Sequence, residues 1–154
     1  GLTDVYDNVH MGLCAEICAE EMNISREEQD QFALNSYKKS TESWNNGFFE
    51  NEITEVKIET RKGETIIKED DEFKNINLEK FKKLRTVFKK DGTVTAGNAS
   101  TINDGAAAVI IMSKEKAIEL GIKAIAKIIS YADASQEPKW FTAPPSKSPA
   151  SLSA

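Results

Sequence analysis

The pattern of apolar and polar positions predicts two consecutive helices at the start of the chain. From Val9 to Met22 the residues are good helix formers, and the apolar ones recur at helical spacing: Met11, Leu13, Cys14, Ile17 and Cys18. Ser25 and Glu28 have the spacing of a capping box that opens the second helix. Asn46-Gly47 predicts its end. Its buried face is expected to carry Ala33, Tyr37 and Trp44.

The residues after this helix predict a hairpin and then a polar loop. Ile53–Ile58 and Thr65–Lys68 have strand composition and flank Lys62-Gly63, a favourable turn pair. The charged stretch from Glu69 to Lys90 contains apolar residues at irregular spacing. It is therefore expected to be a loop held down by its apolar side chains, with one helical turn.

The composition changes at Thr93, and the pattern beyond it predicts part of an α/β core. Ala106–Met112 is a continuous apolar run, as expected for a strand buried on both faces. Ser113 is expected to cap a short helix that Gly121 closes, and Ile122–Tyr131 to form a second buried strand. Strand, helix, strand at this length is a βαβ-like unit. The Pro-, Ser- and Ala-rich tail 144–154 is predicted to be a linker or disordered.

Composition restricts the classes of function. The chain has 154 residues, is 40% hydrophobic and carries a net charge of −5, so neither a membrane span nor a general nucleic-acid binder is expected. Cys14 and Cys18 do not make a disulfide framework, which favours an intracellular protein. The first residue is Gly1 rather than methionine, as expected of a truncated or processed chain.

The segment from Thr93 to Gly105 carries the most suggestive chemistry. Its small residues allow a ligand to approach the backbone, and Gly97 and Gly105 relax backbone constraints. Hydrogen-bonding groups come from Asn98, Ser100, Asn103 and Asp104. The residues alone are equally compatible with a tight turn that leads into a buried strand.

A metal site is the other reading that the residues allow. His10, Cys14 and Cys18 are spaced by four, so one helix face would carry all three, and imidazole and thiolate both bind zinc. Cysteine is also among the most frequently buried residue types, and packing is the favoured interpretation here.

Five stretches, in order, resemble the thiolase family. They are Gly1-Leu-Thr-Asp-Val-Tyr6, His10-Met-Gly-Leu-Cys-Ala-Glu16, Ser25-Arg-Glu-Glu-Gln-Asp30, Asn35-Ser-Tyr37, and Thr93 to Gly105 with the three alanines that follow. The resemblance covers roughly residues 1–141 and is greatest to acetoacetyl-CoA thiolases that respond to potassium. It implies a thiolase-like α/β fold, present here as an α+β loop (cap) domain with part of the α/β core.

The resemblance also implies domain boundaries and a function. Residues 1–92 are expected to be the loop domain that covers coenzyme A, 93–121 the end of the N-terminal core domain, 122–141 the start of the C-terminal domain, and 142–154 a disordered or aberrant tail. Thiolases condense two acetyl-CoA molecules to acetoacetyl-CoA, or run the reverse cleavage. Their catalytic cysteines, histidine and asparagine match no position here, so the chain is expected to be an inactive internal fragment of an acetyl-CoA C-acetyltransferase.

Coenzyme A, as substrate, is the ligand that the resemblance implies, and no covalently bound cofactor is expected. His10 and Met11 resemble the pair that lines the pantetheine and acyl pocket, and Ser100 the serine that hydrogen-bonds the pantetheine arm. Four residues fall where the family contacts the nucleotide end: Asn75, Ile76, Asn77 and Lys80. A solvated lysine-rich loop is the alternative for this last group.

Potassium is the second ligand implied. Tyr37, which also counts among the coenzyme A-binding positions, and the backbone at Ala96, Gly97 and Ala99 match the potassium-holding positions of responsive members. Hydroxyl and carbonyl oxygens suit a hard cation. The alternative is that Tyr37 only packs on its helix face.

Two other functions remain open at this point. One is a non-catalytic acyl-CoA-binding module, and the other is a fragment of a longer-chain 3-ketoacyl-CoA thiolase. For the parent protein the family implies acetyl-CoA and acetoacetyl-CoA as partners, a homotetramer, and a cytoplasmic or mitochondrial location.

Overall fold

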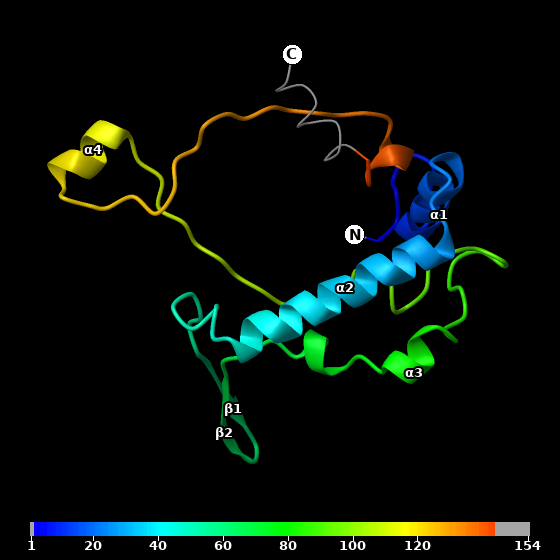
Figure 1. Ribbon diagram of the computed structural model, residues 1–154, viewed down its shortest axis with the longest axis horizontal. Helices are drawn as coiled ribbons and strands as arrows, with labels where there is room; N and C mark the ends of the chain where they lie inside the picture. Colours follow the sequence, from blue (N-terminus) through cyan, green and yellow to red (C-terminus); the bar gives the residue numbers. More distant parts are fainter. Residues whose placement is uncertain (1, 144–154) are drawn as a thin grey trace.

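The computed structural model describes residues 2–143 (Figure 1). Two helices, α1 (Met11–Glu21) and α2 (Arg26–Asn45), form its main body, and a long polar loop runs beneath α2. An extended arm then leaves this body, carries the short helix α4 (Lys114–Glu119) at its far end, and returns to α1 at the 3₁₀ turn η2 (Pro138–Trp140). The predicted tail 144–154 lies outside the described residues, as does Gly1 of the first motif.

Local capping explains where both long helices begin and end. The Nδ1 atom of His10 accepts a hydrogen bond from the Gly12 amide at the start of α1, and Ser25 and Glu28 form the expected capping box at the start of α2. After α2 the left-handed conformation is taken by Gly47, with φ of 69°, while Asn46 stays at −91°. Both predicted helices are confirmed.

The predicted hairpin is confirmed as well. Strands β1 (Val56–Thr60) and β2 (Gly63–Ile67) pair antiparallel, with Val56 opposite Ile67, and project from the end of α2 (Figure 1). Every residue of both strands is exposed, so the hairpin contributes little to the core.

The polar loop is pinned by two aromatic side chains, as predicted. Phe73 lies in the 3₁₀ turn η1 (Glu72–Lys74) and stacks on Trp44 of α2, with ring centroids 5.8 Å apart. Phe81 ends the single-turn helix α3 (Leu78–Phe81) and is only 3% exposed. These buried rings fix a segment whose charged residues remain in solvent.

The two strands predicted at 106–112 and 122–131 are not formed, and that prediction is wrong at the level of secondary structure. Both segments are extended without regular structure, and Val109 and Ile110 are 83% and 88% exposed. A strand exists only through ladder hydrogen bonds with a neighbour, and among residues 2–143 the only sheet is the β1–β2 hairpin. The helix between them, α4, is confirmed, with Ser113 as its cap and Gly121 at φ 66° after its end.

The described chain has no helix with the length and apolar character needed to cross a bilayer. The division into 1–92, 93–121, 122–141 and 142–154 remains a prediction.

Candidate functional site

The small-residue segment that begins at Thr93 is anchored to α1 by a buried carboxylate. Glu16 is 3% exposed, and its Oε2 accepts hydrogen bonds from the Thr93 amide at 2.8 Å and the Thr93 hydroxyl at 3.0 Å. Its Oε1 accepts from the Thr93 amide at 3.0 Å and from the Val94 amide at 2.8 Å. Both oxygens of one side chain therefore fix two consecutive peptide groups.

The same segment is anchored to α2 through Asn98. Its Oδ1 accepts from the Thr95 amide at 2.7 Å, and its Nδ2 donates to Asp30 Oδ1 at 2.9 Å and to the Thr93 carbonyl at 3.0 Å. Asp30, only 9% exposed, also pairs with Arg26 at 2.8 Å. The segment is thus a tight turn, as one reading predicted, but it does not lead into a formed strand.

His10 and Met11 lie at the start of α1, where the structure adds a residue that sequence reasoning left without a role. The ring of Phe88 stacks on His10, with centroids 4.8 Å apart and planes inclined by 26°. Phe88 also lies directly against Gly12, because a Cβ built there would overlap its ring. In the sequence Phe88 is one apolar residue of an irregular loop, and only the pairing with His10 singles it out.

Replacing Gly12 with alanine is expected to push the Phe88 ring off His10. The backbone of Gly12 is helical, where alanine is favoured, so the effect must come from the overlap with the ring. We expect a loss of about 1–3 kcal/mol of unfolding free energy, typical of overpacking, measured by urea denaturation. In a Phe88→Ala background, Gly12→Ala should cost less than it does in the wild type, and an equal cost in the two backgrounds would contradict the explanation.

Tyr37 is half-buried on α2 and faces η1. Its hydroxyl donates to Glu72 Oε1 at 2.8 Å. Burial, followed by this hydrogen bond to the carboxylate, raises the pKa of Tyr37 to about 12. The hydrogen bond of Tyr37 goes to Glu72 and not to the turn at residues 96–99, so the structure does not join the predicted potassium residues by a direct contact.

The backbone of the turn is nevertheless available to a cation. No hydrogen bond formed among residues 2–143 uses the carbonyl oxygens of Ala96, Gly97 or Ala99. These oxygens, with the Tyr37 hydroxyl and the Glu72 carboxylate, are donors of the kind that hard cations take. The residues present therefore fit the predicted ligand chemistry.

Of the predicted nucleotide-end residues, Asn75, Ile76 and Asn77 lie between η1 and α3, and Lys80 lies within α3. Asn77 is the N-cap of α3, with Oδ1 accepting from the Lys80 amide at 3.0 Å. Asn75 and Lys80 are exposed, and Ile76 is half-buried. Ser100 is exposed at the base of the extended arm. Ser100 thus lies on a different segment from residues 75–80, and the role of each of these residues stays a prediction.

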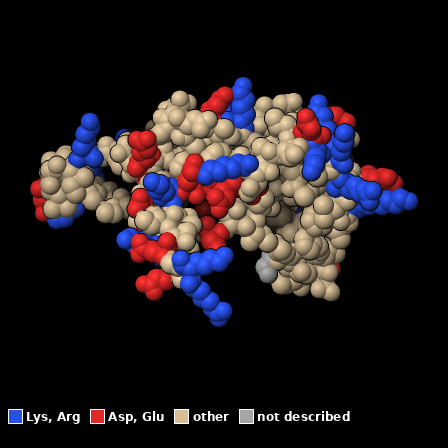
Figure 2. Space-filling model, turned by 90° about the horizontal axis from the view of Figure 1, so that it is seen from below, with Lys and Arg blue, Asp and Glu red and all other residues tan. Residues whose placement is uncertain are grey.

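A shallow groove of about 460 Å³ adjoins Phe88, lined by Arg26 and residues 84–91. Its basic residues include Arg85 and Lys90, and Figure 2 shows such residues interspersed with acidic ones over the visible surface. Two residues of the predicted zinc alternative have other partners: His10 caps α1, and Cys18 contacts the Met22 sulfur at 3.7 Å. The third, Cys14, is completely buried, and burial raises the pKa of its thiol. No group of three metal-binding side chains lies together within residues 2–143.

Comparison with known proteins identifies the family. Residues 1–115 match the model of the thiolase N-terminal domain, and the chain belongs to the thiolase family. It is 53% identical over 146 residues to an acetyl-CoA acetyltransferase of Yarrowia lipolytica, covering 95% of this chain and 37% of that protein. It is 51% identical over 147 residues to the mitochondrial acetyl-CoA acetyltransferase of Rattus norvegicus, covering 94% and 35%. The chain thus spans little more than a third of these relatives.

Solved thiolase structures have the same fold. The acetyl-CoA acetyltransferase of Bacillus anthracis matches with a TM-score of 0.89 and 36% identity, over 99% of this chain and 40% of that one. A thiolase of Ascaris suum in complex with coenzyme A matches with a TM-score of 0.88 and 41% identity, over 99% and 39%. The predicted thiolase-like α/β class is therefore confirmed. Because the match includes almost the whole chain, the extended arm follows a path found in complete thiolases.

Proposed function

We propose that this chain forms the coenzyme A-covering part of an acetyl-CoA C-acetyltransferase, which condenses two acetyl-CoA molecules to acetoacetyl-CoA or cleaves the product. The single observation that carries the proposal is the stacked pair of His10 and Phe88, which is connected through the hydrogen bond from Val87 to Val94 to the segment that Glu16 and Asn98 hold. An aromatic pair of this kind suits the apolar parts of the pantetheine arm.

The nucleophile of the reaction is proposed to come from outside these 154 residues. Thiolate, not thiol, attacks a thioester, and burial raises the pKa of Cys14. Cys18 is also buried, with its sulfur on Met22. His10 is committed to the Gly12 amide and the Phe88 ring and is not paired with either thiol. The chain alone is accordingly expected to be inactive in thiolysis of acetoacetyl-CoA.

Potassium is proposed to bind the carbonyls of Ala96, Gly97 and Ala99 together with Tyr37. The cation would supply positive charge that tightens the turn beside Ser100, whose hydroxyl is proposed to hydrogen-bond the pantetheine arm. Lys80 and its neighbours Asn75, Ile76 and Asn77 are proposed to meet the nucleotide end. A cytoplasmic or mitochondrial location and a homotetrameric parent complete the proposal.

A longer-chain substrate is the second candidate. The human mitochondrial 3-ketoacyl-CoA thiolase matches with a TM-score of 0.88 and 36% identity, over 97% of this chain and 38% of that one. We propose the short-chain class instead, because the relatives that are 51% and 53% identical in sequence are named acetyl-CoA acetyltransferase.

The test is calorimetric titration of the chain with coenzyme A, in potassium chloride and in sodium chloride at equal ionic strength. We expect saturable binding that is tighter in potassium. Phe88→Ala should remove it, while Phe32→Ala, an equivalent truncation of a side chain that is 79% exposed on α2, should leave it unchanged. Equal binding by wild type and Phe88→Ala would contradict the proposed pocket, and equal binding in the two salts would contradict the potassium site.

A further inference from the structure

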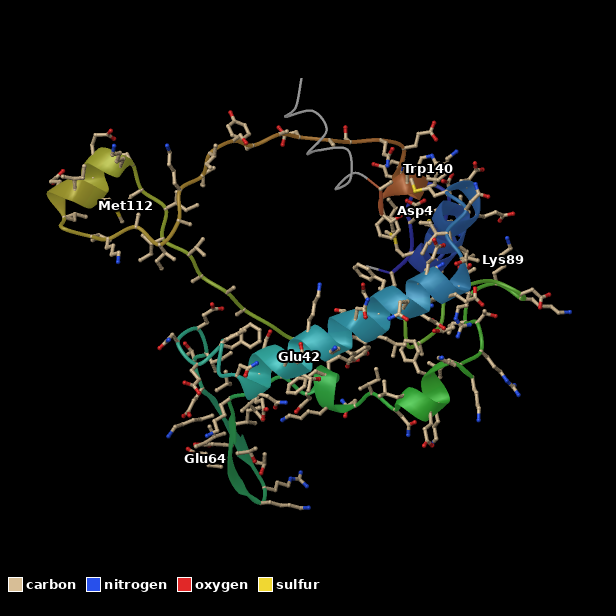
Figure 3. All side chains as sticks on the ribbon, in the orientation of Figure 1. Asp4, Glu42, Glu64, Lys89, Met112 and Trp140 are labelled. Atoms are coloured by element: carbon tan, nitrogen blue, oxygen red, sulfur yellow. The ribbon has the colours of Figure 1, made fainter. Side chains whose placement is uncertain are left out.

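The buried carboxylate of Glu16 connects the two parts of the candidate site, which are the stacked pair of His10 and Phe88 and the turn 95–99. Glu16 is a buried residue of α1, the helix that His10 caps, and the labelled Lys89 in Figure 3 lies beside this helix, where it pairs with Glu20. The four hydrogen bonds of Glu16 all come from Thr93 and Val94. Burying a carboxylate costs free energy unless donors replace its hydration, and an apolar side chain in its place would avoid that cost.

The hydrogen bond that Glu16 accepts from the Val94 amide connects it to both parts of the site. The carbonyl of Val94 accepts from the Val87 amide at 3.0 Å, within a bridge that pairs Thr86 with Thr95. Val87 precedes Phe88, the ring that stacks on His10. On the other side, Thr95 is completely buried and begins the turn that carries the free carbonyls. Holding Val94 in place therefore holds both the Phe88 ring and the turn 95–99 in place.

A side chain with two acceptor oxygens matches these partners. Backbone N–H groups donate and cannot accept, and they occupy both oxygens of Glu16. A glutamine offers one oxygen and one NH₂ group, so one amide would face another donor. A buried donor without a partner is destabilising, and the segment would move to relieve it.

We infer that Glu16 is the positioning residue of the coenzyme A site, acting through Val94 on the Phe88 ring and on the turn 95–99. This inference rests on the proposed coenzyme A function. Glu16 is not one of the residues proposed to contact coenzyme A or potassium. Through Val94 it holds the segment of Phe88 and the turn 95–99 in the arrangement that binds coenzyme A.

Glu16→Gln tests the inference, with Glu20→Gln as the matched control. Glu20 lies one turn later on α1 and pairs with Lys89 at 2.5 Å at the surface, so the control removes the same charge and a contact to the same loop. We expect Glu16→Gln to weaken coenzyme A binding about tenfold or more, since its NH₂ group would face a backbone N–H where the carboxylate oxygen now accepts one, and Glu20→Gln to change it less than about twofold. Wild-type affinity in Glu16→Gln would overturn the inference.

Amide hydrogen exchange on the chain without ligand separates positioning from general stability. In Glu16→Gln, faster exchange confined to Thr93, Val94 and Val87 supports positioning, whereas a uniform increase over α2 and the hairpin would show a structural role only and overturn the inference. Absence of coenzyme A binding in the wild type would defeat the proposed function, and unchanged exchange at these amides would separately defeat the positioning role.

A second variant covers the case in which Glu16→Gln does not fold. Gly92→Ala keeps the carboxylate but adds a methyl group that overlaps it, at a backbone conformation that alanine can adopt. It is expected to raise exchange at Thr93 and Val94 and to weaken coenzyme A binding in the same direction. Wild-type exchange and affinity in Gly92→Ala would count against the inference.

Discussion

Replacing Phe81 with alanine is expected to cause the largest loss of stability of any single substitution in the loop. Phe81 is 3% exposed, and its ring lies against Gly97, where an added Cβ would be 2.6 Å from it. Truncating a buried phenylalanine costs about 3–5 kcal/mol, through lost transfer free energy and the cavity that remains. Whole domains are stable by only about 5–15 kcal/mol, so urea denaturation should show a greatly lowered midpoint or no cooperative transition.

The control for this prediction is Phe32→Ala. It makes the same change on a side chain that is 79% exposed on α2, where surface substitutions usually stay within about 0.5 kcal/mol. If both variants lose stability equally, Phe81 does not anchor the loop. If neither does, the polar contacts of Glu16 and Asp30 hold the turn without it.

The features that the sequence predicted correctly depend on neighbours close along the chain. The capping box joins Ser25 to Glu28, three residues away, and α2 ends at the adjacent residues Asn46 and Gly47. The hairpin and α4 have the same local character. Such interactions lie inside the window that periodicity and capping rules examine.

The apolar runs at 106–112 and 122–131 failed for the opposite reason. Their composition reflects burial, and Ile110 and Ile125 are nevertheless 88% and 104% exposed. Burial of a strand requires ladder and face partners, and the described residues provide none for these runs. The apolar composition of these runs thus predicted a buried environment that residues 2–143 do not provide.

Long-range pairs account for what was missed at the site. Glu16 lies 78 positions before Val94, and Asp30 lies 68 before Asn98. Neither spacing is a motif, and a buried acidic residue on a helix reads in sequence as part of its solvated face. The resemblance to thiolases drew attention to His10 and Ser100, but only the folded chain pairs His10 with Phe88.

Replacing Tyr37 with phenylalanine is expected to abolish the potassium response while leaving some coenzyme A binding. The change removes one oxygen donor and leaves Glu72 without its hydrogen bond from the phenol. We expect affinities in potassium chloride and sodium chloride to become equal, measured by the same titration. A potassium response of wild-type size in this variant would remove Tyr37 from the site. The carbonyls of Ala96, Gly97 and Ala99 would then act without it.

The same variant is expected to change the alkaline limit of stability. Burial and Glu72 raise the pKa of Tyr37 to about 12 in the folded chain, above the value of about 10 for an exposed tyrosine. Between these values the folded state holds a proton that the unfolded state has lost, so stability falls as pH rises. The contribution of the neutral phenol is fully present below about pH 10 and is lost by about pH 12.

Urea denaturation at a series of pH values separates the contribution of the Tyr37 phenol to stability from the titration of other groups. Wild type should lose stability more steeply than Tyr37→Phe between about pH 10 and 12, because the variant has no phenol to ionise. Tyr131→Phe is the control, since Tyr131 is 85% exposed and its removal should leave the wild-type slope unchanged. Parallel curves for wild type and Tyr37→Phe would mean that Tyr37 ionises as freely folded as unfolded. The Glu72 contact would then be absent in solution, and the half-buried phenol would be free to turn toward the carbonyls of the turn.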